Sequence, residues 1–81
     1  MWFFNNKLRR QKELERRIEK TGLSLPEALS QNRGYQVILH RNIHLGNCVT
    51  SNDLYFAFTT YGEACEHIID WHNKNFPYDK V

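Results

Sequence analysis

Histidine and cysteine side chains are the groups in this chain best suited to metal chemistry. His40, His44 and Cys48 follow one another at intervals of four, and Cys65 and His67 come later in the sequence. Structural zinc sites usually take ligands from close pairs such as C-x-x-C, and the sequence has none. We therefore expect no metal and no cofactor, and keep a zinc-binding domain as the third of three functional hypotheses.

Covalent and acid-base catalysis are the other chemistries to weigh. Cys65 and His67 are two residues apart in a predicted helix, so their side chains do not face each other. Glu66 and Asp70 are four apart and form a like-charge pair, which is typical of a solvated helix face. The sequence has no P-loop, dinucleotide fingerprint or G-x-S-x-G spacing. We predict that the protein is not an enzyme.

A basic segment behind an apolar tip is the clearest functional signal. Seven of the 11 Lys and Arg residues fall between Lys7 and Lys20, where three glutamates leave a net charge of +4. The rest of the chain sums to −2, which is consistent with the overall charge of +2. The tip is Met-Trp-Phe-Phe at residues 1–4. Such charge asymmetry between two parts of a chain points to a binding partner.

Protein binding is the first hypothesis for that partner. Trp and Arg are enriched among the residues that dominate binding energy at protein interfaces. The candidate partner-binding residues are Trp2, Phe3, Phe4, Arg9, Arg10, Arg16 and Arg17. Small, aromatic-rich chains without catalytic motifs are common among the accessory proteins of phages and mobile elements. By that association we expect a non-catalytic adaptor or inhibitor.

Nucleic-acid binding is the alternative hypothesis. The basic residues between Lys7 and Lys20 offer many phosphate contacts. A three-stranded sheet with one packed helix, the architecture expected here, is similar to that of DNA-binding modules such as integrase arm-binding domains. The interleaved glutamates and a pI of 8.7 weigh against this hypothesis, because basic nucleic-acid-binding domains usually have a pI above about 9.

Length and composition predict one small domain. We expect a basic helical arm over residues 1–22 and a compact core over residues 23–81. Two cysteines are too few for a disulfide framework, and no apolar run approaches the roughly 20 residues that span a bilayer. We therefore expect a cytoplasmic protein without stable membrane insertion. A homo-oligomer would be consistent with a sheet whose edges are uncovered.

Two helices are expected before the sheet. Residues 5–20 are predicted to form the basic helix, which Gly22 ends. The few apolar residues of this segment fall on different faces, so we expect the helix to pack loosely or to project. Ser24 and Glu27 have the spacing of a capping box, which predicts a short second helix over residues 23–31.

The second half of the chain predicts an α+β fold. Apolar alternation from Tyr35 onward, with turns expected at 41–42 and 51–53 and a bulge or turn at 46–47, indicates a small antiparallel sheet of about three strands. Thr60 and Glu63 form a second capping-box spacing, which predicts a C-terminal helix that packs on the sheet. The expected apolar stripe of this helix is Tyr61, Ala64, Cys65, Ile68 and either Trp71 or His72.

Overall fold

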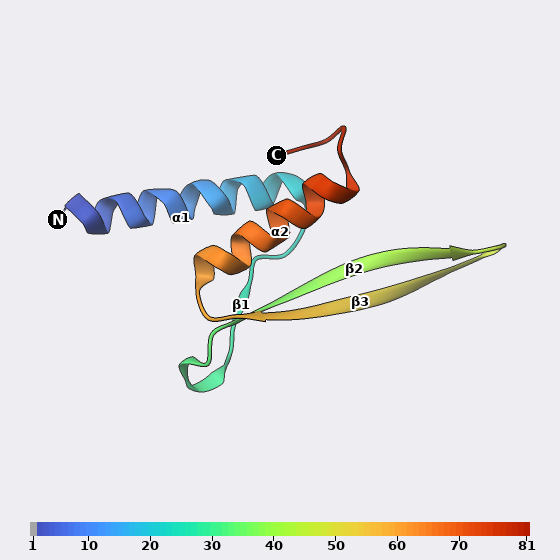
Figure 1. Ribbon diagram of the computed structural model, residues 1–81, viewed down its shortest axis with the longest axis horizontal. Helices are drawn as coiled ribbons and strands as arrows, with labels where there is room; N and C mark the ends of the chain where they lie inside the picture. The colour runs from blue at the N-terminus through green and yellow to red at the C-terminus, as the bar shows by residue number, and fades with distance from the viewer. Residues whose placement is uncertain (1) are drawn as a thin grey trace.

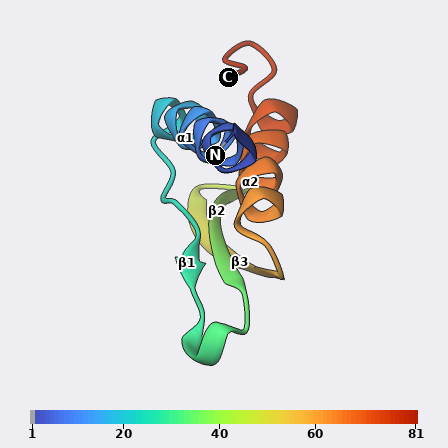
Figure 2. The same cartoon turned by 90° about the vertical axis from the view of Figure 1, so that its left-hand side faces the viewer.

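The α+β fold is confirmed in a computed structural model of the chain (Figure 1). The backbone is described for residues 2–81, and the side chains for these except residues 2–5, 41–45 and 48–51. The elements are α1 (Trp2–Thr21), β1 (Glu27–Ala28), a 3-10 turn (Ser30–Asn32), β2 (Tyr35–Leu45), β3 (Cys48–Phe58) and α2 (Tyr61–Asn75). Both helices lie on the same face of the antiparallel sheet, whose strand order is β1-β2-β3 (Figure 2).

A long β-hairpin dominates the sheet. β2 and β3 each have 11 residues and pair without interruption from Tyr35↔Phe58 to Leu45↔Cys48. The two residues between the strands are Gly46 and Asn47, and Gly46 has a φ of 60°, which the tight turns of such hairpins favour. The turn expected at 46–47 is therefore confirmed.

The turns expected at 41–42 and 51–53 were wrong. Both segments are continuous strand, and they lie opposite one another, with Arg41 paired to Asn52 and Asn42 to Ser51. Each segment has a locally turn-like composition, but the two satisfy each other's backbone hydrogen bonds across the ladder. The third strand is instead the two-residue β1, which pairs with the start of β2.

One face of the hairpin packs against the helices. Val37 and Leu39 on β2 are buried, and their cross-strand partners Phe56 and Leu54 are partly buried against the same core. The cluster also contains Ile68, as expected for the face that carries Phe56. The alternate residues of each strand face away from the helices.

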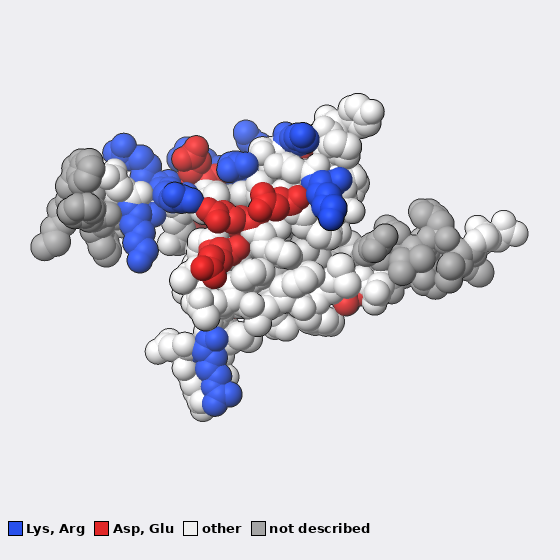
Figure 3. Space-filling view, in the orientation of Figure 1, with Lys and Arg blue, Asp and Glu red and all other residues white. Residues whose placement is uncertain are grey.

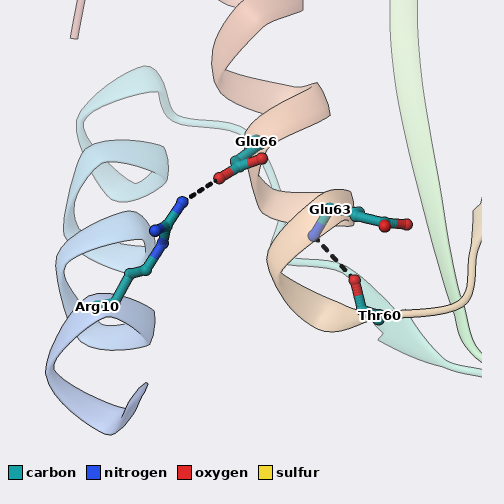
Figure 4. Close-up of polar contacts among 4 residues, drawn as sticks. All are labelled: Arg10, Thr60, Glu63 and Glu66. Carbon is teal, nitrogen blue, oxygen red and sulfur yellow. Dashed lines mark hydrogen bonds and ion pairs between the residues drawn. The ribbon is translucent and has the colours of Figure 1, made fainter. Parts of the chain in front are cut away.

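Helix α2 begins where its capping residues predict. The Thr60 hydroxyl accepts a hydrogen bond from the Glu63 backbone N–H at 3.3 Å (Figure 4). Four of the expected stripe residues are buried, namely Ala64, Cys65, Ile68 and His72, together with Ile69. α2 therefore forms the centre of the core, with the sheet on one side and α1 on the other.

Helix α1 is longer and better anchored than the sequence predicts. It spans Trp2–Thr21, and its side chains Leu14 and Ile18 are buried in the core beside α2. The expectation of loose packing was therefore wrong for the C-terminal half of α1, since a single i,i+4 apolar pair is sufficient to dock it. The core thus includes residues from both sides of the boundary expected at residue 22.

The second helix expected over residues 23–31 was also wrong. Glu27 and Ala28 form β1, and only the 3-10 turn follows. Gln31 and Asn32 have φ values of 59° and 55°, which end any helix, and the Leu29 N–H donates to the Gly34 carbonyl at 2.8 Å. Strand pairing with β2 overrides the local capping signal, because an isolated nine-residue helix is marginal in water.

None of the helices formed by the described residues has both the length and the apolar content needed to cross a bilayer.

Candidate functional site

The N-terminal half of α1 extends past the start of α2, as the blue end of the ribbon in Figure 1 shows. We call residues 2–10 the projecting segment. The side chains of residues 6–10 are exposed, and Leu8 keeps 40% of its surface accessible. Leu14 and Ile18 anchor the other half of the same helix, which places the exposed side chains of residues 6–10 beside the core rather than in it.

Two of the four candidate arginines lie on the outer side of α1. Arg9 and Arg16 are seven residues apart, which is close to two helical turns, so they share one face. Both are exposed, and neither makes an ion pair within the described part of the chain. Lys20 continues the same face one turn later and is exposed too. We call Arg9, Arg16 and Lys20 the outer basic stripe.

The other two candidate arginines make contacts within the fold. Arg10 Nη2 lies 2.6 Å from Glu66 Oε1 on α2 (Figure 4). Arg17 Nη2 donates to the Val81 carbonyl at 3.1 Å, and Asn73 Oδ1 accepts from the Val81 backbone N–H. The sequence grouped Arg10 and Arg17 with the partner-binding residues, but the structure gives both a contact that holds α1 against the C-terminal part of the chain.

Acidic side chains border the basic ones. Figure 3 shows Lys and Arg along α1, with Asp and Glu gathered in a band toward the centre of the same face. On α2 the exposed acidic residues are Glu63, Glu66 and Asp70. A phosphate backbone that approached this face would meet both signs of charge, which lowers the attraction that a purely basic helix would exert.

A shallow hollow of about 610 Å³ lies where the projecting segment meets the start of α2. Lys7, Arg10 and Gln11 of α1 line one side, and Tyr61 and Glu63 of α2 line the other. The lining includes side chains of both charges and two aromatic rings, those of Tyr35 and Tyr61.

The aromatic tip falls outside the described side chains. Trp2, Phe3 and Phe4 form the first turn of α1 by backbone conformation, and their side chains are not among those described. The structure therefore brings the backbone of these three candidate residues onto the same helix as Arg9 and Arg16. Their contacts stay a prediction.

The histidines and the cysteine expected to be structural contact neighbouring residues where their side chains are described. His40 Nδ1 lies 2.5 Å from Asp53 Oδ1 across the hairpin, and His72 Nε2 lies 2.9 Å from the Asp79 carbonyl oxygen. His67 packs against the ring of Phe56, and its buried Nε2 has no hydrogen-bond partner among the described atoms. No group of three or more His, Cys, Asp or Glu among the described side chains could hold a metal ion. The side chains of His44 and Cys48 lie outside this set.

Cys65 is buried and poorly suited to nucleophilic chemistry. Burial is the main cause that raises the pKa of its thiol to about 11, although a hydrogen bond with Tyr61 acts in the opposite direction. The pKa of Tyr61 is raised as well, first by burial and then by its neighbours Cys65 and Glu15. At neutral pH both groups stay protonated, and the thiolate needed for attack is absent.

Sequence reasoning expected uncovered sheet edges but did not locate the outer edge of β3. In the sheet formed by the described residues β3 pairs only with β2, so one side of its backbone has no strand beside it. The expected division into three short strands hid this edge, because it placed residues 48–58 in two separate elements.

Comparisons with protein-family models, with curated proteins and with solved structures found no match to this chain.

Proposed function

We propose that this chain is a small non-catalytic protein-binding module, an adaptor or inhibitor, which binds its partner through the projecting segment. The observation that carries the proposal is the anchoring of α1 by Leu14 and Ile18, which leaves residues 6–10 exposed beyond the core. A segment that is already helical loses less conformational entropy on binding than a disordered one, and preorganisation of this kind favours affinity.

The composition of the projecting segment supports a protein as partner. It combines the aromatic residues of the tip with the exposed Leu8 and Arg9. Aromatic residues and Arg are enriched at protein interfaces, and Leu8 contributes apolar surface that binding would remove from water. A helix that lays apolar residues into a groove is a common mode of peptide recognition.

Substitution of single residues tests this proposal more cleanly than deletion of residues 1–20, because deletion would also remove Leu14 and Ile18 from the core. Proteins are captured from a lysate with the native chain, with Leu8→Ala and Arg9→Ala, and with Arg33→Ala as a matched control. Arg33 is exposed and follows the 3-10 turn, outside α1. We expect the same protein to be captured by the native and Arg33→Ala chains and lost with the other two. Equal capture by all four would contradict the proposal.

Nucleic-acid binding through the outer basic stripe is the second candidate function. The exposure of Arg9, Arg16 and Lys20 on one face of α1 favours it. A fluorescent duplex and a random single strand are titrated at low and moderate salt with the native chain and an Arg9→Ala/Arg16→Ala variant. Affinity that falls steeply with salt and is lost in the variant would support this function, whereas no binding at about 50 mM salt would exclude it.

A further inference from the structure

The outer edge of β3 is a regular strand edge with no device that blocks pairing. Residues 48–58 contain no Pro, Lys or Arg, and Asp53 is the single charged residue. The ladder with β2 has no bulge, since each residue from Cys48 to Phe58 has one partner. Natural proteins usually protect such edges with charges, prolines, bulges or very short strands. At the opposite edge β1 pairs only with Tyr35 and Gln36 of β2, and the rest of β2 carries Arg41, a charge of the kind that protects a strand edge.

Apolar side chains on β3 are incompletely covered by the protein's own core. Leu54 and Phe56 face the helices but stay partly exposed, whereas their partners on β2, Leu39 and Val37, are buried. On the other face Tyr55 keeps 62% of its surface accessible. The incompletely covered apolar side chains therefore lie along the open edge of β3, which points to a partner strand beside it.

The backbone groups on this edge follow a fixed alternation. Leu45 and Cys48 close a two-residue loop and form a hydrogen-bonded pair, so every second residue from Cys48 bonds to β2. Leu54 is one of these. Asp53, Tyr55 and Ala57 therefore direct their N–H and C=O groups toward the open edge, where a second strand would receive them.

We propose that β3 pairs antiparallel with β3 of a second copy of this chain, about a two-fold axis at Leu54. In this register residues 51–57 pair with residues 57–51 of the second copy. Leu54 lies opposite its own counterpart on the helical face, and Asp53 lies opposite Tyr55, with which it exchanges backbone hydrogen bonds. Antiparallel pairing of identical strands about a two-fold axis keeps the helices of both copies on one face of a continuous six-stranded sheet.

The sequence of β3 is self-complementary in this register. A two-fold axis at Asp53 would place two carboxylates directly opposite each other, which is destabilising. The axis at Leu54 replaces that pair with two apolar side chains and extends the covered surface over Leu54 and Phe56. Self-complementarity of this kind is a requirement of any two-fold interface. The inference does not depend on the proposed role of α1.

Cysteine cross-linking tests both the dimer and its register. Residues opposite each other at a position without hydrogen bonds are about 4.5 Å apart between Cα atoms, within the range that a disulfide spans. In a Cys48→Ser background, Leu54→Cys should give a covalent dimer under mild oxidation. Asn52→Cys is the matched control and should stay uncoupled, because Asn52 lies opposite Phe56 of the second copy. Coupling of Asn52→Cys alone, or of neither variant, would overturn the register.

The mass in solution is the second test, and it needs no cysteine. Sedimentation equilibrium of the native chain should give twice the mass of one chain at high concentration. Tyr55→Glu places a carboxylate directly opposite Asp53 of the second copy, twice about the two-fold axis, and should raise the dissociation constant at least tenfold, whereas circular dichroism stays unchanged because Tyr55 is outside the core. Arg33→Ala should leave the dimer intact. A native chain that has the mass of one chain up to millimolar concentration would overturn the proposal.

Discussion

Arg10 on α1 and Glu66 on α2 join two helices that are 56 residues apart in the sequence, with 2.6 Å between Nη2 and Oε1. Both side chains are largely exposed, at 73% and 47% of their surface. The pair therefore orients α1 without burying charge, and the free energy it contributes is limited by solvent and salt. The first prediction follows from this balance.

Arg10→Ala should lower the free energy of unfolding by about 0.2–1 kcal/mol at low salt, as is usual for exposed ion pairs. The loss should shrink when salt is added, because screening already weakens the pair in the native chain. Urea denaturation at two salt concentrations measures it. Arg9→Ala is the control, since Arg9 is exposed on the same helix without a described ion pair. An equal loss in both variants would show that the ion pair is not the cause.

Ile18→Ala should lower the free energy of unfolding by about 2–5 kcal/mol, because it leaves a cavity where Ile18 is buried between α1 and α2. Leu8→Ala on the same helix should change it by no more than about 0.5 kcal/mol, since Leu8 is exposed and not in the core. Chemical denaturation of the two variants compares the anchored and projecting halves of α1. A small loss for Ile18→Ala would mean that α1 is not part of the core.

Thr60→Ala should cost about 1 kcal/mol, because the Glu63 N–H at the start of α2 loses its hydroxyl acceptor. Thr60→Asn should recover most of that stability, since Asn is an equally good N-cap residue. The midpoints of thermal unfolding of the three proteins give the comparison. If Thr60→Asn is as unstable as Thr60→Ala, the Thr60 side chain acts through something other than the cap.

The free energy of unfolding should fall as the pH rises from about 9 to about 11. Over this range the unfolded chain releases the Cys65 proton near the ordinary pKa of 9.0, whereas the folded chain holds it until about pH 11. The folded state binds more protons, so raising the pH favours unfolding. Urea denaturation at pH 8 and pH 10 measures the slope.

Cys65→Ala tests the origin of that slope. The variant should show a smaller fall between pH 8 and pH 10 than the native chain. The substitution should not abolish the fall in the free energy of unfolding, because the raised pKa of Tyr61 also makes that free energy decrease as the pH rises. An unchanged slope would assign the pH dependence to other groups.

Features encoded within a few residues could be predicted from the sequence. Thr60 and Glu63 mark the start of α2 because the cap is made by residues three positions apart. The stripe that contains Ala64 and Ile68 repeats at helical spacing and is buried as expected. In each case the physical cause lies in the local chain.

Features that depend on contacts between residues far apart in the sequence could not be predicted in this way. Ser51 and Asn52 resemble a turn until Asn42 and Arg41 are known to lie opposite them. For the candidate site, the chain showed which arginines α1 carries, but only the packing of α1 on α2 separates the ion-paired Arg10 from the outward Arg9.

The place of α1 in the core also constrains how the chain folds during synthesis. Leu14 and Ile18 leave the ribosome before the residues that bury them, among them Ile68 and Ile69 of α2. The hairpin can close early from local contacts, whereas α1 has no docking site until α2 has emerged. Completion of the core is therefore a late event, and until then the apolar side of α1 is accessible to chaperones.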